Sequence, residues 1–291
     1  MRITDTMLSN RVIASINESK ARLGELQTIL STGKRINKPS DDPLRISSAL
    51  NLKRELKDID QYLRNTQTAS AWVDLTTQTL SEVIDVLNSA KTIALRESNI
   101  TSTPDSKRVS IQEVKSLKEK LLSLANTSYG GRYLFAGTKT LTRPFLEDGT
   151  YKGDEGEINI QIGEKRTITI NAPGSEVFKG EEDIFSVLSD LENALENNST
   201  QDINNQLERL KVCFQQIQRW QGDIGGRAKR VELSQNRLQD QTVSVNKLLS
   251  YTEDADIIKT STELQAAGVA YQAALSAGRQ ILQYTLIQFW K

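Results

Sequence analysis

The sequence predicts a mainly α-helical fold: a long antiparallel, coiled-coil-like helical bundle built from both chain ends, with a small β-hairpin-rich insertion in the middle. Apolar residues recur at alternating steps of three and four over residues 52–94 and again over residues 207–252. This is the spacing of a helix with a coiled-coil seam, and it predicts the bundle. Between residues 158 and 170 apolar and polar residues alternate instead, as in half-buried strands, and this change of period predicts the insertion.

The first and last segments of the chain carry narrower apolar stripes. The same spacing occurs over residues 9–33 at one end and 264–289 at the other. Helices with so little apolar surface are marginal in water when isolated. We therefore expect residues 1–42 and 255–291 to form terminal helices that depend on each other or on other subunits. We also expect these ends to be more mobile in the monomer than the bundle.

The two long registers define the bundle itself. They span roughly 63 Å and 68 Å at 1.5 Å per residue, and two helices of nearly equal reach favour antiparallel packing. A shorter helix near residues 105–127 and another over residues 184–195 complete the helical part, which we place at residues 43–129 and 183–254. Polar residues occupy seam positions where Leu or Ile would be more stabilising, and we hypothesise that they keep the monomer easy to unfold: Thr66, Ser70, Thr77, Gln221, Gln235 and Thr242.

Residues 130–182 are expected to form a small, β-rich acidic insertion between the two halves of the bundle. Isoleucines alternate with polar residues on both sides of a turn expected at Gly163-Glu164, which indicates a hairpin with one apolar face. Residues 145–200 hold 13 Asp or Glu and only 4 Lys or Arg. The insertion and its surroundings are therefore expected to present a solvated, acidic surface.

Composition excludes much of enzyme chemistry. The chain has no histidine, one cysteine, and 37 basic against 37 acidic residues. His-based acid–base catalysis, His-activated nucleophiles and His- or Cys-rich zinc sites are therefore excluded, as is a disulfide within the chain. We expect no catalytic residue, no cofactor and no bound metal, and so no enzyme.

Nucleic-acid binding and membrane insertion are also not expected. Residues 1–57 hold 11 Lys or Arg against 6 Asp or Glu, but the region lacks aromatic residues to stack on bases. No stretch approaches the roughly 18 apolar residues of a membrane span. Residues 1–6, MRITDT, contain no apolar core of a cleaved signal peptide,.

Four local motifs have structural explanations. The acidic residues at 148–157 have the wrong spacing for a calcium-binding EF-hand and indicate a solvated turn. Residues 222–227, GDIGGR, lack the ending of a phosphate-binding loop and indicate a kink or local break in the second long helix. Asp41 and Asp42 precede a proline that opens a helix, and are expected to cap it. Cys213 is expected to be an inert, partly buried thiol.

Both ends of the chain carry family motifs. The amino-terminal half contains residues 30–37, LSTGKRIN, and residues 39–43, PSDDP; the carboxyl end contains LQAA at 264–267 and AYQAAL at 270–275. This combination resembles the flagellin superfamily. Within it, MRIT at the start, PLRI at 43–46 and GRYLFAGT at 131–138 are similar to the hook–filament junction family rather than to flagellins. The resemblance covers about residues 1–145 and 205–291.

The resemblance implies a structural adaptor of the bacterial flagellum. Such a protein is exported by the flagellar type III apparatus without a cleaved signal peptide and lies outside the cell. It forms a homo-oligomeric ring that joins the hook, through the first hook-associated protein, to the flagellin filament, and an export chaperone covers its carboxyl-terminal helix. The terminal helices then form an inner coiled layer. The resemblance places subunit contacts at Leu30, Ser31, Thr32, Gly33, Arg35, Ile36, Asn37, Asp41, Asp42, Tyr271, Gln272, Leu275, Ile281, Leu282 and Phe289.

Two other functions stay open at this point. A filament-forming flagellin has the same terminal motifs and would polymerise by itself. A secreted coiled-coil adhesin or effector would share the helical pattern without any role in motility.

Overall fold

A computed structural model describes the backbone of residues 5–98 and 104–289, and side chains at residue 7, residues 9–98 and residues 107–280. The described residues fall into two compact units. The first comprises Met1–Asp58 and Thr242–Lys291, and the second Ile59–Gln241. Helices dominate both units, and the strands form two small antiparallel sheets. The predicted mainly α-helical fold with a small β insertion is confirmed.

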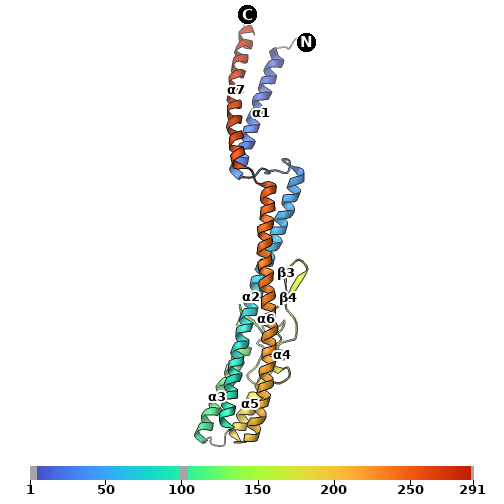
Figure 1. Cartoon of the computed structure of the whole chain (residues 1–291). Helices are drawn as coiled ribbons and strands as arrows, with labels where there is room; N and C mark the ends of the chain where they lie inside the picture. The colour runs from blue at the N-terminus through green and yellow to red at the C-terminus, as the bar shows by residue number, and fades with distance from the viewer. Residues whose placement is uncertain (1–4, 99–103, 290–291) are drawn as a thin grey trace. The chain divides into compact units, whose positions relative to one another are not determined.

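The first unit is built around the pair of terminal helices. Helix α1 (Asp5–Thr32) and helix α7 (Ile257–Phe289) lie side by side (Figure 1). Helix α1 ends where Gly33 adopts a φ of +70° and its N–H donates to Ile29 O at 2.8 Å, because glycine tolerates the left-handed conformation that ends many helices. Helix α7 begins after Asp256, whose carboxylate accepts the N–H of Lys259 at 3.0 Å,.

The two long helices run through the predicted registers. Helix α2 covers Pro43–Glu97 and helix α6 covers Thr200–Glu253. In the second unit they pack with helix α3 (Pro104–Ala125) and helix α5 (Ile184–Glu196) into one core. Seam positions of both registers are buried in this core: Val73, Leu80, Leu87, Ala94, Leu210, Ile217, Ile224 and Val231. The heptad pattern therefore identified the packing faces correctly.

The local break predicted in α6 is wrong. Residues 222–227 do not interrupt the helix, which is continuous from Thr200 to Glu253. Ile224 is fully buried, and Arg227 donates to the carbonyl oxygens of Thr169 at 3.2 Å and Asn171 at 2.8 Å. These tertiary contacts hold the segment helical in spite of its glycines, whose low helix propensity suggested a break.

The insertion contains two hairpins and a short helix. Strand β1 (Ser128–Tyr129) pairs with β2 (Arg132–Tyr133), and β3 (Asn159–Gly163) with β4 (Arg166–Thr169). A register shift near Gly163 moves the second turn to Glu164-Lys165, one residue later than expected. Helix α4 (Gly174–Lys179) follows. The core beside it is aromatic, with ring centroids 5.1–6.1 Å apart among Phe135, Phe145, Phe178 and Phe185.

Candidate functional site

The segment that carries the amino-terminal motif folds back onto the end of α6. The backbone N–H of Arg35 donates to Glu253 O at 2.7 Å, and the N–H of Ala255 donates to Gly33 O at 2.9 Å. We call residues 33–42 together with residues 252–256 the junction clasp. It lies where α1 ends and α7 begins, so it fixes the base of both terminal helices within the first unit.

Glu253 is the electrostatic centre of the junction clasp. Its side chain is 5 % exposed, and its two carboxylate oxygens lie 2.7 Å from Lys34 Nζ and 2.5 Å from Lys53 Nζ. Burial raises the pKa of Glu253, but the hydrogen bonds from Lys34 and Lys53 outweigh it and the net pKa is lowered. The same hydrogen bond raises the pKa of Lys34. One acid therefore joins the end of α1, the first part of α2 and the end of α6.

The two aspartates of the motif have different roles. Asp42 Oδ1 accepts the N–H of Arg45 at 3.0 Å, so Asp42 caps α2 as predicted. Asp41 does not cap this helix. Its carboxylate accepts the N–H of Lys38 at 2.7 Å and of Asn37 at 2.9 Å, and these bonds lower the pKa of Asp41. Asp41 therefore closes the loop that precedes α2.

The residues expected at subunit contacts separate into three groups. Ile36 is only 4 % exposed, and Arg35, Asn37, Asp41 and Asp42 donate or accept hydrogen bonds inside the first unit. A second group lies on or near the surface of the terminal helices, either exposed or half-buried: Leu30, Ser31, Thr32, Gly33, Tyr271, Gln272 and Leu275. The side chains of Ile281, Leu282 and Phe289 lie outside the described residues.

The pair of terminal helices leaves much of its apolar surface uncovered. Leu26 is the only residue of α1 classed as buried among the described side chains. The helices come close at Gly278, where an added methyl group would lie 2.9 Å from a methyl of Ile16. Large apolar side chains elsewhere on the pair are exposed: Met7, Ile13, Ile257, Ile258, Val269 and Leu275. Such a surface is typical of a protein that packs against others.

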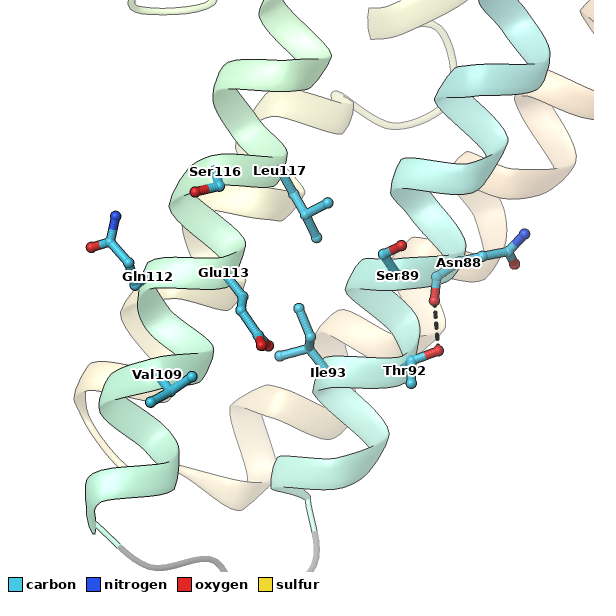
Figure 2. Close-up of a pocket in the computed structure, with 9 residues that line it drawn as sticks. All are labelled: Asn88, Ser89, Thr92, Ile93, Val109, Gln112, Glu113, Ser116 and Leu117. Atoms are coloured by element: carbon cyan, nitrogen blue, oxygen red, sulfur yellow. Dashed lines mark hydrogen bonds between the residues drawn. The ribbon is translucent and has the colours of Figure 1, made fainter.

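A second surface feature lies between α2 and α3. It is a groove of about 640 Å³ (Figure 2), lined by Asn88, Ser89, Thr92, Ile93, Val109, Gln112, Glu113, Ser116 and Leu117. Glu113 points across the groove toward Ile93 in Figure 2, and its carboxylate accepts a hydrogen bond from Arg96 at 2.7 Å. The charged side chain of the lining is thus engaged in an ion pair, so the groove suits packing rather than proton transfer.

The acidic residues of the suspected calcium loop and the single cysteine have structural roles. Asp148 accepts the N–H of Thr150 at 2.9 Å, and Asp154 accepts the hydroxyl of Thr138 at 2.6 Å. Burial raises the pKa of the Cys213 thiol to about 12. Among the described side chains no three His, Cys, Asp or Glu residues are grouped as metal ligands. Within the same part of the chain no helix has the length and apolar character of a membrane span.

Sequence reasoning missed the acidic half of the junction clasp. Glu253, Asp254 and Asp256 follow directly on the last residue of the second register, at Thr252. The presence of three acidic residues within four positions at the end of a long helix could have indicated an electrostatic contact there. The basic partners of Glu253 could not be identified, because Lys34 and Lys53 lie about 200 residues away from it in the sequence.

Comparison with known proteins gives matches at both ends of the chain. The model for the bacterial flagellin N-terminal helical region matches residues 3–140, and that for the bacterial flagellin C-terminal helical region matches residues 207–290. The chain is 34 % identical over 180 residues to flagellar hook-associated protein 3 of Escherichia coli (strain K12), and 32 % identical over 180 residues to that of Salmonella typhimurium. Each match covers 61 % of this chain and 57 % of the relative.

A solved structure has the same fold. The chain superposes on Bacillus cereus FlgL with a TM-score of 0.62 at 21 % identity, over 69 % of this chain and 99 % of that chain.

Proposed function

Because this chain belongs to the flagellin family, we propose that it is a structural adaptor of the bacterial flagellum, joining the hook to the flagellin filament. It acts by packing of subunits and not by catalysis. The relatives named hook-associated protein 3 support this role. The junction-type motifs at residues 1–4, 43–46 and 131–138 favour it over a filament-forming flagellin.

The observation that carries the proposal is the incomplete burial of the terminal helices. Helices α1 and α7 pair with each other yet leave apolar side chains such as Ile13, Val269 and Leu275 exposed. A ring of identical subunits is built from heterologous contacts, and these side chains offer the apolar surface for them. The zero net charge of the chain limits repulsion between copies,.

The predicted contact residues have two different roles in this proposal. Leu30, Ser31, Thr32, Tyr271, Gln272 and Leu275 lie at or near the surface, and they contact neighbouring subunits together with Ile281, Leu282 and Phe289. Gly33, Arg35, Ile36, Asn37, Asp41 and Asp42 hold the junction clasp and so set the direction in which the terminal helices leave it.

The proposed partners follow from the same role. They are further copies of this chain in a ring, the first hook-associated protein on the hook side and flagellin on the filament side. An export chaperone covers α7 before assembly. The chain reaches the outside of the cell through the flagellar export apparatus.

Deletion of the gene tests the proposal. Electron microscopy of the deletion strain should show hooks without filaments, and unpolymerised flagellin should accumulate in the medium. Re-expression of the chain should restore filaments. Intact swimming in the deletion strain would contradict the proposal and favour an adhesin or effector. Unaided growth of long filaments from the purified chain would indicate a flagellin instead.

A further inference from the structure

One level of the second unit combines poor helix formers from both long helices. On α6, Gly222, Gly225 and Gly226 share one exposed face, and a methyl group added at any of them would meet no atom within 4 Å. None of the three has a positive φ. Glycine is the poorest helix former after proline, and neither packing nor backbone geometry within this chain requires it here.

The part of α2 at the same level is also weak. Gln221 Nε2 donates to Ser81 Oγ at 2.9 Å, which places these turns of α6 beside residues 76–81 of α2. Four of those six residues are Ser or Thr. The hydroxyls of Thr76, Thr77 and Thr79 each donate to the carbonyl four residues earlier, at 2.8–2.9 Å, and such bonds slightly destabilise helices. We call residues 76–81 and 221–226 the weak level.

Two polar features lie among the buried side chains at the weak level, which include Leu80 and Ile224. The seam here includes the polar pair of Gln221 and Ser81. The indole Nε1 of Trp72, one turn before Thr76, is buried and has no hydrogen-bond partner within the described structure, which costs free energy in the folded state. Helix α3 ends at Ala125, and Trp72 meets Tyr129 beyond it, with ring centroids 6.4 Å apart. The weak level thus lies near the end of α3, where a loop and a short strand replace the third helix.

We propose that the weak level is the opening site of the second unit, where the two long helices separate and unwind before the rest of that unit. Opening there gives the export apparatus a segment of bundle that unfolds at low cost. Export of this chain rests on the proposed function, whereas the opening is a property of the purified chain and is measured without it.

Amide hydrogen exchange and thiol labelling of the purified chain test the opening. Amides of residues 221–228 should exchange at least about tenfold faster than those of residues 208–216 in the same helix. Cys213 is buried and lies outside the weak level, so a thiol reagent should label it only at the slow rate of global unfolding. Equal exchange in the two segments, or labelling of Cys213 as fast as exchange at the weak level, would overturn the proposal.

A triple variant tests whether the three glycines of α6 cause the opening at the weak level. Gly222→Ala, Gly225→Ala and Gly226→Ala together should slow exchange at residues 221–228 by roughly a hundredfold, at about fivefold per glycine, and raise Tm by about 5–10 °C. Gly24→Ala is the matched control, because Gly24 is also an exposed helical glycine with open space around it, in α1. It should leave exchange at residues 221–228 unchanged; a similar effect of both changes would overturn the proposal.

Secretion of the same variants then tests whether opening at the weak level assists export. The triple variant should be secreted several-fold more slowly than the wild type, and Gly24→Ala at the wild-type rate. Wild-type secretion of the triple variant would overturn the proposal, and if that variant then failed to enter the flagellum, the glycines would belong to a subunit contact. Failure of the wild-type chain itself to be secreted with flagellar proteins would contradict the proposed function and leave the exchange result standing.

Discussion

At the scale of single residues, Glu253 should contribute most to the junction clasp. Glu253→Gln keeps the shape of the side chain but removes the charge that pairs with Lys34 and Lys53 at 2.7 and 2.5 Å. Loss of these charge-assisted hydrogen bonds at a buried group should lower the free energy of unfolding by about 1–3 kcal/mol. Urea unfolding at pH 7 measures it.

A matched control tests whether the effect depends on the burial of Glu253 or arises from any loss of a glutamate charge on α6. Glu208→Gln is the same change on the same helix, but Glu208 is 79 % exposed and pairs with Lys211 at 3.7 Å. Exposed ion pairs contribute little, so its effect should stay below about 0.5 kcal/mol. Equal effects of the two substitutions would contradict a special role for Glu253.

The contribution of Glu253 should disappear in acid. Its pKa in the folded chain lies below the ordinary value of 4.5, so its stabilisation is complete above that value and is lost as the pH falls through the folded pKa. The difference in urea midpoint between wild type and Glu253→Gln should be constant from pH 7 to about pH 5.5. It should then narrow as the pH falls through the folded pKa of Glu253, because protonation makes this side chain neutral like the amide of the variant,. A difference that persists undiminished at pH 3 would show that the amide, and not the missing charge, destabilises the variant.

The predictability of the clasp differs from residue to residue. The role of Asp42 as a cap follows from its place before Pro43, because capping is a local interaction. The role of Asp41 was predicted wrongly, since two equivalent acids precede the helix and only the loop conformation decides which one caps it. Ile36 is adjacent to exposed residues in the motif, and its burial depends on a tertiary contact. The local sequence therefore identifies the motif, but it does not show which of its side chains are buried and which are exposed.

At the scale of elements, the long helices could be predicted and the insertion only in part. Periodicity defines α2 and α6 because their burial repeats over many turns. The hairpin of β3 and β4 follows from alternation, but a bulge near Gly163 moved its turn. The short strands β1 and β2 and the helix α4, six residues long, contain too few residues to show any period. They are held by tertiary packing, including the aromatic cluster beside α4.

The terminal helices should be the least stable elements of the monomer. Among its described side chains, α1 buries only Leu26, whereas the seam of α2 buries residues such as Val73, Leu80 and Leu87. Local stability follows buried apolar contact, so amides within α1 and α7 should exchange at least about tenfold faster than those of residues 56–75 and 82–87 of α2, which lie outside the weak level. Hydrogen exchange of the purified monomer measures this. Equal protection of α1, α7 and these residues of α2 would mean that the apolar surface of the terminal helices is already buried in the monomer.

At the scale of the whole molecule, folding and assembly should depend on different side chains. Leu275 is 43 % exposed on α7, so Leu275→Asp removes little packing from the monomer and should change the free energy of unfolding by less than about 1 kcal/mol. In the assembled flagellum the carboxylate introduced at position 275 would be buried against a neighbouring subunit. It would have no partner of opposite charge there, which should cost several kcal/mol. The variant should therefore fold and be secreted, but cells that carry it should have hooks without filaments.

Leu141→Asp provides the control for this prediction. Leu141 is 81 % exposed in the insertion, so its substitution introduces the same charge at an apolar surface position away from the terminal helices. Cells with this variant should swim normally, because the proposed contacts are made by α1 and α7. Normal filaments on cells with Leu275→Asp would remove Leu275 from the proposed contacts. Loss of filaments in both variants would show that assembly depends on the insertion as much as on the terminal helices.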